Sequence, residues 1–442
     1  APAQINVPRD YWTQVIDIDL PPIVRFERQG GGKKAIDEAA KILSNAKFPV
    51  ILSGAGVVIG NAIEDCKKLA EKLDAPVCNG YQHNDSFPGN HPLAVGPLGY
   101  NGSKAAMELI SKADVVLALG TRLNPFSTLP GYGIDYWPKN ATIIQVDMNP
   151  DRIGLTKKVT VGICGDAKLV SQQILEKLSS NAGDNGREDR KNLIHQTKSS
   201  WLQTLTSLDH EDDDPGTVWN KEARERDKER MSPRQAWRAI QAGMPDDVII
   251  SSDIGNNCAI GNAYPTFEKG RKYLAPGLFG PCGYGFPSIL GAKIGCPDTP
   301  VIGFAGDGAF GISMNEMSSC ARKEWPSITM VIFRNYQWGA EKRNSILWFD
   351  DNFVGTELDP ELSYAKVATA CGLKGVTVKT MEETTSAIKQ SCLDQKKGIT
   401  TFIEVILNQE LGEPFRRDAM KKPVKVAGIN TKDMRPQILK NG

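Results

Sequence analysis

The stretch VIGFAGDGAF, residues 301–310, places an aspartate between two glycines directly after an apolar run. A carboxylate at the end of a buried strand is costly unless hydrogen-bond donors or a cation pair with it. Glycine has no Cβ, so a flanking glycine lets another group come very close to the backbone. The stretch therefore predicts that Asp307 ends a buried strand and faces a closely bound group.

The residues that follow predict one βαβ unit. A helical pattern, SMNEMSSCARKE (313–324), leads to a second apolar run, ITMVIF (328–333), which ends in Arg334 and Asn335. Because such crossovers are almost always right-handed, the two strands are expected to be parallel, with their carboxyl ends at one edge. Asp307 and Asn335, 28 positions apart, should then converge at the crevice where open α/β sheets bind ligands.

These side chains favour a metal site beneath a diphosphate. An Asp carboxylate, an Asn amide oxygen and a nearby backbone carbonyl form an all-oxygen set that suits Mg²⁺ or Ca²⁺, and Mg²⁺ completes its shell with water and substrate phosphates. The backbone amides after Gly308, at the start of a helix, would hold those phosphates. A simple turn is the competing interpretation of a GDG triplet alone, and the Asn after the next strand favours the metal.

The rest of the chain alternates between helical and strand patterns in two separate stretches, which indicates an α/β fold with two parallel-sheet, helix-covered domains. Between them the composition turns polar and rich in charges of both signs, which is typical of a solvated connecting helix with loops. The predicted parts are a strand remnant and linker (1–33), a Rossmann-like central domain (34–178), a charged linker (179–232), a diphosphate- and Mg-binding domain (233–407) and a basic tail (408–442).

Composition excludes several classes of protein. The net charge of +1 gives no reason to expect nucleic acid or an anionic membrane as a partner. No apolar stretch approaches the roughly 20 residues that a membrane helix needs. The nine scattered cysteines include no CxxC pair and suit a reducing cytoplasm. With only four histidines, a histidine-based metal site is not expected.

The GDG triplet followed after nearly 30 residues by Asn resembles the signature of thiamine-diphosphate-dependent enzymes of the acetolactate synthase and pyruvate oxidase type. The resemblance runs along almost the whole chain. It implies that Asp307, Asn335 and the backbone carbonyl of Gln337 bind Mg²⁺. One departure is Arg334, because the family usually has Asn-Asn where this chain has Arg-Asn; the ligand is the second of the two, so the metal assignment stands.

The same resemblance implies the contacts of thiamine diphosphate. Ile312 corresponds to the apolar wedge that bends the cofactor. FGPCGYGFP (279–287) is similar to the aminopyrimidine segment, in which the carbonyl of Gly280 and the amide of Cys282 would contact the ring. SDIGNN (252–257) is similar to a loop beside the diphosphate. The implied cofactor-binding residues are Asn256, Asn257, Gly280, Cys282, Gly306, Gly308, Ala309 and Ile312.

Two long stretches narrow the resemblance. Residues 333–359 and 410–425 are similar to the sulfoacetaldehyde acetyltransferases, which convert sulfoacetaldehyde and phosphate to acetyl phosphate and sulfite. Because both substrates are anionic, cationic side chains are expected to meet them, and the arginine fork matches such oxyanions. The candidates are Lys342 and Arg343, with Arg416 and Arg417 on the tail; solvated surface cations are the alternative interpretation.

The family also implies an activating glutamate on an N-terminal pyrimidine-binding domain, shared across a homodimer or homotetramer. APAQINVPRD (1–10) is similar to the last strand and exit linker of that domain, so no glutamate is nominated and poor turnover by the chain alone is expected. The alternatives are a thiamine-dependent 2-oxo acid decarboxylase or acetolactate-forming enzyme, and a cofactor-binding fragment without catalysis.

A glycine-rich stretch in the central region gives a weaker signal. GAGVVIG (54–60) follows a predicted strand, but its spacing is GxGxxxG rather than the dinucleotide fingerprint GxGxxG. Some members of the family bind FAD or ADP in this domain and others leave it empty. An empty domain is the preferred interpretation, since the implied reaction needs no redox cofactor, and a nucleotide-binding regulator is a distant alternative.

Overall fold

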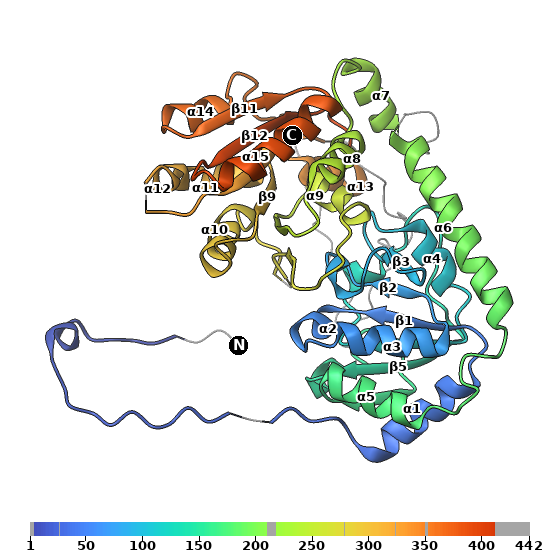
Figure 1. The fold of residues 1–442 in the computed structure, drawn as a ribbon. Helices are drawn as coiled ribbons and strands as arrows, with labels where there is room; N and C mark the ends of the chain where they lie inside the picture. Colours follow the sequence, from blue (N-terminus) through green and yellow to red (C-terminus); the bar gives the residue numbers. More distant parts are fainter. Residues whose placement is uncertain are drawn as a thin grey trace, which may run out of the picture.

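The computed structural model describes residues 4–25, 27–209, 218–277, 279–322, 324–349 and 352–411. It contains two six-stranded sheets, and every strand pairing in both is parallel. Helices cover the sheets, and the two sheets lie one above the other in Figure 1. The predicted α/β class with two parallel-sheet units is confirmed.

The first sheet has the strand order β3-β2-β1-β4-β5-β6, so the order reverses between β1 and β4. Its strands are β1 (Pro49–Ser53), β2 (Val77–Asn79), β3 (Ala94–Pro97), β4 (Val115–Leu119), β5 (Thr142–Asp147) and β6 (Val161–Cys164). The helices around it are α1 (Lys33–Asn45), α2 (Ala55–Ile59), α3 (Ile63–Leu73), α4 (Lys104–Ile110) and α5 (Ala167–Lys177). β1 and β4 are buried along their whole length because helices cover both faces of the sheet.

The second sheet has the order β11-β12-β10-β9-β7-β8. Its strands are β7 (Ile249–Ser252), β8 (Tyr273–Leu274), β9 (Val301–Gly306), β10 (Thr329–Arg334), β11 (Lys374–Val378) and β12 (Thr401–Ile406). The helices are α8 (Pro233–Gly243), α9 (Asn256–Ile260), α10 (Gly285–Gly295), α11 (Asp307–Ser313), α12 (Met317–Cys320), α13 (Gly339–Trp348), α14 (Tyr364–Ala370) and α15 (Met381–Gln395). Two apolar clusters pack on this sheet, one containing Trp237 and the other Phe286.

The predicted βαβ unit is present, because β9 and β10 are parallel neighbours and Gly306 pairs with Phe333. The prediction of one helix over residues 313–324 is wrong. α11 begins earlier, at Asp307, and a 3₁₀ turn at Met314–Glu316 separates it from α12. The helix start expected after Gly308 is present, but the helical pattern was assigned only from residue 313, because glycine is a poor helix former.

The charged segment between the sheets forms α6 (Arg187–Asp209) and α7 (Val218–Arg226). α6 runs beside both sheets in Figure 1, packed on α4 and α8. The expectation of a solvated helix is wrong at Arg190, which is 1% exposed. Its guanidinium donates to the carbonyl oxygens of Asp74, Lys47, Asn185, Leu73 and Gly183. A charged side chain can be buried when every donor finds an acceptor.

The alternating pattern at the start of the chain forms no strand in residues 4–8, and a 3₁₀ turn follows at Arg9–Thr13. Ile5 and Trp12 are 86% and 75% exposed. A strand needs a hydrogen-bonding neighbour, and no strand of the described chain lies beside this segment. Figure 1 shows it extending away from both sheets. None of the helices in the described ranges is both long and apolar enough to cross a membrane.

Candidate active site at the carboxyl edge of the second sheet

Three predicted site segments follow neighbouring strands. The loop after β7 carries Asn256, β9 leads into Asp307, and β10 leads into Asn335. β9 lies between β7 and β10, and all three strands are parallel. Their carboxyl ends therefore meet at one edge, where α/β sheets bind ligands.

The carboxylate of Asp307 is 1% exposed and accepts three hydrogen bonds. Its Oδ1 accepts from the amide of Gly308 at 2.9 Å, and its Oδ2 accepts from the amide of Tyr336 at 2.7 Å. The guanidinium of Arg334 donates to the same Oδ2 at 3.1 Å. The hydroxyl of Tyr364 donates to the backbone carbonyl of Asp307 at 2.9 Å. These contacts fix the side chain and the backbone of this residue together.

Burial raises the pKa of Asp307 to about 6, and the Arg334 guanidinium with the backbone amides opposes that shift. The shift means that desolvation of the carboxylate outweighs its hydrogen bonds and its ion pair. At neutral pH the group is still mostly ionised. It can therefore serve as an anionic ligand without first losing a proton.

Arg334, the departure from the family pattern, is itself 1% exposed. Besides Asp307 it donates to the carbonyl oxygens of Leu362, at 3.0 Å, and Asp359. Its guanidinium lies 4.2 Å from the centroid of the Tyr336 ring, and its Nε is 3.8 Å from Glu404 Oε1. The arginine thus joins the strand end to the 359–362 segment, and the side chain of Asn335 is not needed for that purpose.

Two buried amide oxygens in the segment where β10 ends accept no hydrogen bond from any described residue: Oδ1 of Asn335 and Oε1 of Gln337. Buried oxygens of this kind are rare unless a ligand or water satisfies them. The Nε2 of Gln337 donates to the carbonyl of Gln409 at 3.0 Å, which holds the side chain in place. Asp307 and Asn335, at the same edge of the sheet, carry oxygen donors of the kind that a small hard cation such as Mg²⁺ binds, whereas the expected ligand at Gln337 is its backbone carbonyl.

The two glycines of the GDG triplet have different surroundings. A Cβ on Gly306 would meet no atom within 4 Å, whereas a Cβ on Gly308 would lie 2.8 Å from the indole ring of Trp338. Gly308 is therefore required by a protein neighbour from the loop after β10. Ala309, the next residue, is also buried.

The predicted pyrimidine side of the cofactor lies close to α11. Ile312 is 57% exposed, and a Cβ on Gly283 would be 3.1 Å from its Cγ2. Gly280 and Gly283 both have positive φ, and the thiol of Cys282 is free and exposed. The structure thus brings the predicted wedge beside the predicted aminopyrimidine segment and leaves the isoleucine side chain accessible.

Asp253 was not nominated from the sequence, although it holds two of the predicted segments together. It is fully buried, with its Oδ1 accepting from the amides of Ile254 and Gly283 and its Oδ2 accepting from that of Gly285, at 2.7–3.1 Å. Burial raises its pKa and these amides lower it. Its place after β7, in SDIG, parallels Asp307 after β9, and this parallel is the signal that could have identified it.

Asn256 and Asn257 begin α9, and both are buried. The Oδ1 of Asn256 accepts from the hydroxyl of Tyr100 at 2.7 Å, while its Nδ2 donates to the carbonyl of Gly339 at 2.8 Å. The Oδ1 of Asn257 has no hydrogen-bond partner among the described residues. The side chain of Asn256 therefore joins α9 to Tyr100 and to the start of α13. The side-chain oxygen of Asn257 could accept a hydrogen bond from a ligand.

Lys342 and Arg343 are 2% and 4% exposed, so the alternative interpretation as solvated surface cations is wrong for this pair. Lys342 forms an ion pair with Glu357. Arg343 lies 4.6 Å from the centroid of the Tyr100 ring and donates to the carbonyl of Leu411 at 3.4 Å. The other predicted cations, Arg416 and Arg417, lie outside the described residues.

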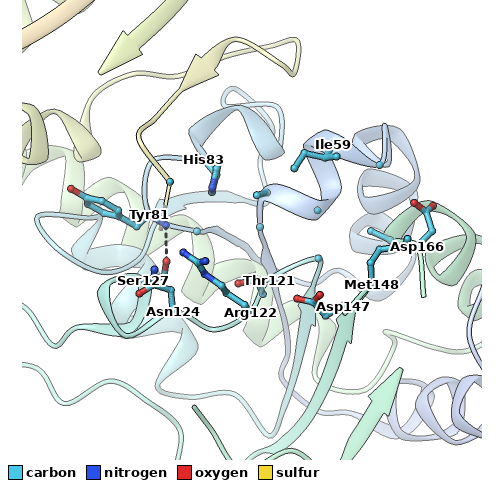
Figure 2. Close-up of a pocket in the computed structure, with 18 of the residues that line it drawn as sticks. Ile59, Tyr81, His83, Thr121, Arg122, Asn124, Ser127, Asp147, Met148 and Asp166 are labelled. Carbon is cyan, nitrogen blue, oxygen red and sulfur yellow. Dashed lines mark hydrogen bonds between the residues drawn. The ribbon is translucent and has the colours of Figure 1, made fainter. Parts of the chain in front are cut away.

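A cavity of about 600 Å³, separate from the site described above, opens at the carboxyl edge of the first sheet (Figure 2). The glycine stretch that follows β1 lines it, together with Gly120 after β4, where the strand order reverses. In Figure 2 His83 and Arg122 extend into the cavity, with Asp147 on its wall. Burial and the nearby Arg122 lower the pKa of His83 to about 4, so this histidine is neutral at physiological pH.

Comparison with known proteins gives one family match for each sheet. Residues 36–177 match the family model described as thiamine pyrophosphate enzyme, central domain. Residues 253–405 match the model described as thiamine pyrophosphate enzyme, C-terminal TPP binding domain. The fold, the oxygen donor set and these matches define the class as thiamine pyrophosphate enzymes.

Curated relatives resolve the class further. The chain is 77% identical to a probable sulfoacetaldehyde acetyltransferase of Rhizobium meliloti (strain 1021), over 99% of this chain and 74% of the relative. It is 72% identical to a sulfoacetaldehyde acetyltransferase of Roseovarius nubinhibens, over 99% of this chain and 72% of the relative. The chain belongs to the sulfoacetaldehyde acetyltransferase family of thiamine pyrophosphate enzymes, which are transferases.

A solved structure shares the fold. Benzoylformate decarboxylase from Polynucleobacter necessarius superposes with a TM-score of 0.68 at 20% sequence identity, covering 92% of this chain and 70% of that one. At that identity the likeness concerns the architecture alone. The chemistry of the site rests on this chain's own residues and on its closer relatives.

Proposed function

We propose that the chain acts in a thiamine diphosphate- and Mg²⁺-dependent transfer that converts sulfoacetaldehyde and phosphate to acetyl phosphate and sulfite. The observation that carries the proposal is the buried carboxylate of Asp307 at the same sheet edge as Asn335, whose buried amide oxygen has no hydrogen-bond partner among the described residues. The names of the relatives supply the substrate class.

In this proposal, Asp307, Asn335 and the backbone carbonyl of Gln337 hold Mg²⁺, and the backbone after Gly308 holds the diphosphate. When bound, thiamine diphosphate supplies the stabilised carbanion that such carbon–sulfur chemistry requires. The protein orients it: Ile312 offers an apolar surface, and Asp253 fixes Gly283 and Gly285 in the segment assigned to the aminopyrimidine ring. Gly280 and Cys282 would act through their backbone atoms.

The substrates carry sulfonate and phosphate groups, so the site must supply positive charge. Lys342 and Arg343 lie on α13, which begins two residues after Gln337. Both side chains are buried on this helix, and the planar fork of Arg343 can donate two parallel hydrogen bonds to one oxyanion. We therefore assign the larger share of oxyanion binding to Arg343.

Sulfite release from sulfoacetaldehyde, measured with and without phosphate in the presence of thiamine diphosphate and Mg²⁺, tests the reaction. Because poor turnover by this chain alone is expected, the assay and the kinetic comparisons below use this chain and a chain extended at its N-terminus. Sulfite and acetyl phosphate formed only with phosphate support the proposal. CO₂ release from pyruvate without sulfite from sulfoacetaldehyde would favour the alternative, a 2-oxo acid decarboxylase or acetolactate-forming enzyme.

Asp307→Asn tests the metal site apart from turnover. The substitution keeps the shape of the side chain but removes its charge, so affinity for Mg²⁺ with thiamine diphosphate should fall about 100-fold or more, beyond the usual effect of residues that only support a ligand. Isothermal titration calorimetry measures the affinity. Unchanged binding would contradict the assignment of Asp307 as a ligand.

Arg343→Ala tests the oxyanion contact. Charge-assisted hydrogen bonds contribute about 1.5–3 kcal/mol, so the KM for phosphate or sulfoacetaldehyde should rise about tenfold or more. Arg322→Ala removes an arginine that is paired with Glu324 and mostly exposed, and it serves as the control with unchanged kinetics. Equal KM values in the two variants would exclude Arg343 from substrate binding.

The cavity at the first sheet bears on the prediction that the central domain is empty. The cavity lies where the strand order reverses, which is where open α/β sheets bind nucleotides. Flavin bands in the absorbance spectrum of the purified protein, or ADP binding without Mg²⁺, would overturn that prediction. Absence of both would leave the cavity without a nucleotide role.

A further inference from the structure

Tyr100 belongs to the first sheet's unit but contacts the proposed cofactor site of the second. It follows β3 and precedes α4, and it is 8% exposed. Its backbone carbonyl accepts from the Nδ2 of Asn262 at 3.2 Å, and its amide donates to the carbonyl of Phe126 at 3.3 Å. The backbone of Tyr100 is thus fixed by residues from both units.

The hydroxyl of Tyr100 determines which way the Asn256 amide faces. It donates to Oδ1 of Asn256 at 2.7 Å, which leaves Nδ2 to donate to the carbonyl of Gly339 at 2.8 Å. Gly339 is the first residue of α13 and comes two positions after Gln337. One chain of hydrogen bonds therefore runs from Tyr100 through Asn256 to Gly339, two residues after the proposed ligand Gln337.

The ring of Tyr100 makes a second contact with the same helix. The guanidinium of Arg343 lies 4.6 Å from the ring centroid, four residues after Gly339 and so one helical turn further along α13. A desolvated cation over an aromatic face is held by the ring's quadrupole. The hydroxyl of Tyr100 thus contacts the first residue of α13 indirectly, through the Asn256 amide. Its ring contacts the second turn directly, at Arg343.

We propose that Tyr100 is a positioning residue for the cofactor and oxyanion sites of the second sheet, its hydroxyl setting Asn256 and its ring setting Arg343. The proposal rests on the proposed function. The proposal gives a residue of the first sheet's unit a role in positioning Asn256 and Arg343, which belong to the second sheet's unit. The hydroxyl and the ring act on different ligands, so substitutions can separate their effects.

The experiment compares Tyr100→Phe, which removes only the hydroxyl, with Tyr100→Leu, which removes the ring as well. Tyr100→Phe leaves a buried oxygen of Asn256 unpaired, so the Kd for Mg²⁺ with thiamine diphosphate, measured by calorimetry, should rise about 5- to 10-fold. The KM for inorganic phosphate should stay within about twofold. Tyr100→Leu should raise both quantities, because Arg343 then loses its aromatic support.

Tyr132→Phe is the matched control. The hydroxyl of Tyr132 donates to the carbonyl of Gly102, in the same loop region, at 2.9 Å, and its ring packs edge-on against Trp201 of α6. It should leave both constants unchanged. A purely structural role for Tyr100 would instead lower the thermal midpoint without changing either constant. Should Tyr100→Leu fail to fold, Tyr100→Phe still tests the hydroxyl.

A double-mutant cycle with Asn256→Ala decides whether the effect passes through Asn256. Once that amide is absent, adding Tyr100→Phe should cost no further affinity; additive losses would overturn the positioning role. If the wild-type chain does not bind Mg²⁺ with thiamine diphosphate, the proposed function fails. If the wild type binds and Tyr100→Phe binds equally well, only the role of Tyr100 fails.

Discussion

Asp307 and Arg334 form an ion pair in which each side chain is 1% exposed. Removing either partner would leave a buried charge without its counter-ion, which is the costly case for such pairs. Two backbone amides also bind the carboxylate, so its orientation does not depend on the arginine alone. Arg334 therefore compensates the charge of Asp307, while the side-chain oxygens of Asn335 and Gln337 have no hydrogen-bond partner among the described residues.

The pH dependence of metal binding follows from this residue. The pKa of Asp307 is raised from its ordinary 3.8 to about 6, so the folded chain holds a proton that the unfolded chain would release between these values. This group's contribution to stability is greatest below about pH 4 and is lost as the pH rises through 6. Mg²⁺ needs the ionised form, so its affinity should be constant above pH 7 and fall towards tenfold per unit well below 6.

Calorimetric titrations of Mg²⁺ with thiamine diphosphate between pH 5 and 8, about the range over which Asp307 changes charge, measure this dependence. Protonation of the free cofactor is titrated separately and subtracted. Affinity that stays constant down to pH 5 after this correction would show that Asp307 remains ionised there, or that it is not a ligand.

At the scale of the element, α11 begins inside the sequence that ends β9, with no intervening loop. A side chain would be accommodated at Gly306, but the indole of Trp338 occupies the space that a Cβ on Gly308 would need. The strand end, the helix start and the loop after β10 consequently depend on one another.

Gly308→Ala tests this dependence. In an open helix the change would stabilise by up to about 1 kcal/mol, but here the new methyl would lie 2.8 Å from the Trp338 ring. We expect destabilisation by about 1–3 kcal/mol from overpacking, together with weaker Mg²⁺ binding, measured by chemical denaturation and calorimetry.

The control for this substitution is Gly291→Ala in the exposed middle of α10, where a Cβ would meet no atom within 4 Å. It should be neutral or stabilising by up to about 1 kcal/mol. A Gly308→Ala variant as stable as this control would mean that Trp338 moves aside without cost.

At the scale of the whole molecule, a buried polar interface joins the two units. Asn262 is fully buried, and its Oδ1 accepts from the amide of Gln82 while its Nδ2 donates to the carbonyls of Leu98 and Tyr100. Asp85 of the central unit accepts from the amides of Lys272 and Tyr273. Such bonds require defined partners on both sides, so they fix how one sheet sits against the other.

Asn262→Ala should weaken this interface. It leaves one amide and two carbonyl groups without partners, so we expect a loss of about 2–4 kcal/mol in the free energy of unfolding. In differential scanning calorimetry the thermal midpoint should fall and the transitions of the two units should separate. Asn45→Ala, at an exposed asparagine that bonds only within α1, should change neither quantity. An unaltered midpoint in Asn262→Ala would show that the units dock without this residue.

Most strands and several helices could be predicted from local patterns, and the strand ends that carry Asp307 and Asn335 were placed correctly. The helix start after Gly308 was expected, but the 3₁₀ turn that divides the helix was not. β3, β6, β8 and β11 were not predicted, and three of them are four residues long or shorter. The burial of Arg190 could not be predicted, since three of its five carbonyl acceptors, those of Asp74, Lys47 and Leu73, lie 116 to 143 positions away.

By itself, the sequence determined the α/β class, the convergence of Asp307 and Asn335 and the family signature, because periodicity and parallel-strand chirality are local or nearly local properties. Only the tertiary structure decided that Arg334 pairs with Asp307, that Trp338 fills the space beside Gly308 and that Tyr100 reaches Asn256. Those contacts join residues up to 156 positions apart. Such contacts depend on how side chains pack in the folded chain, and residue spacing in the sequence does not indicate them.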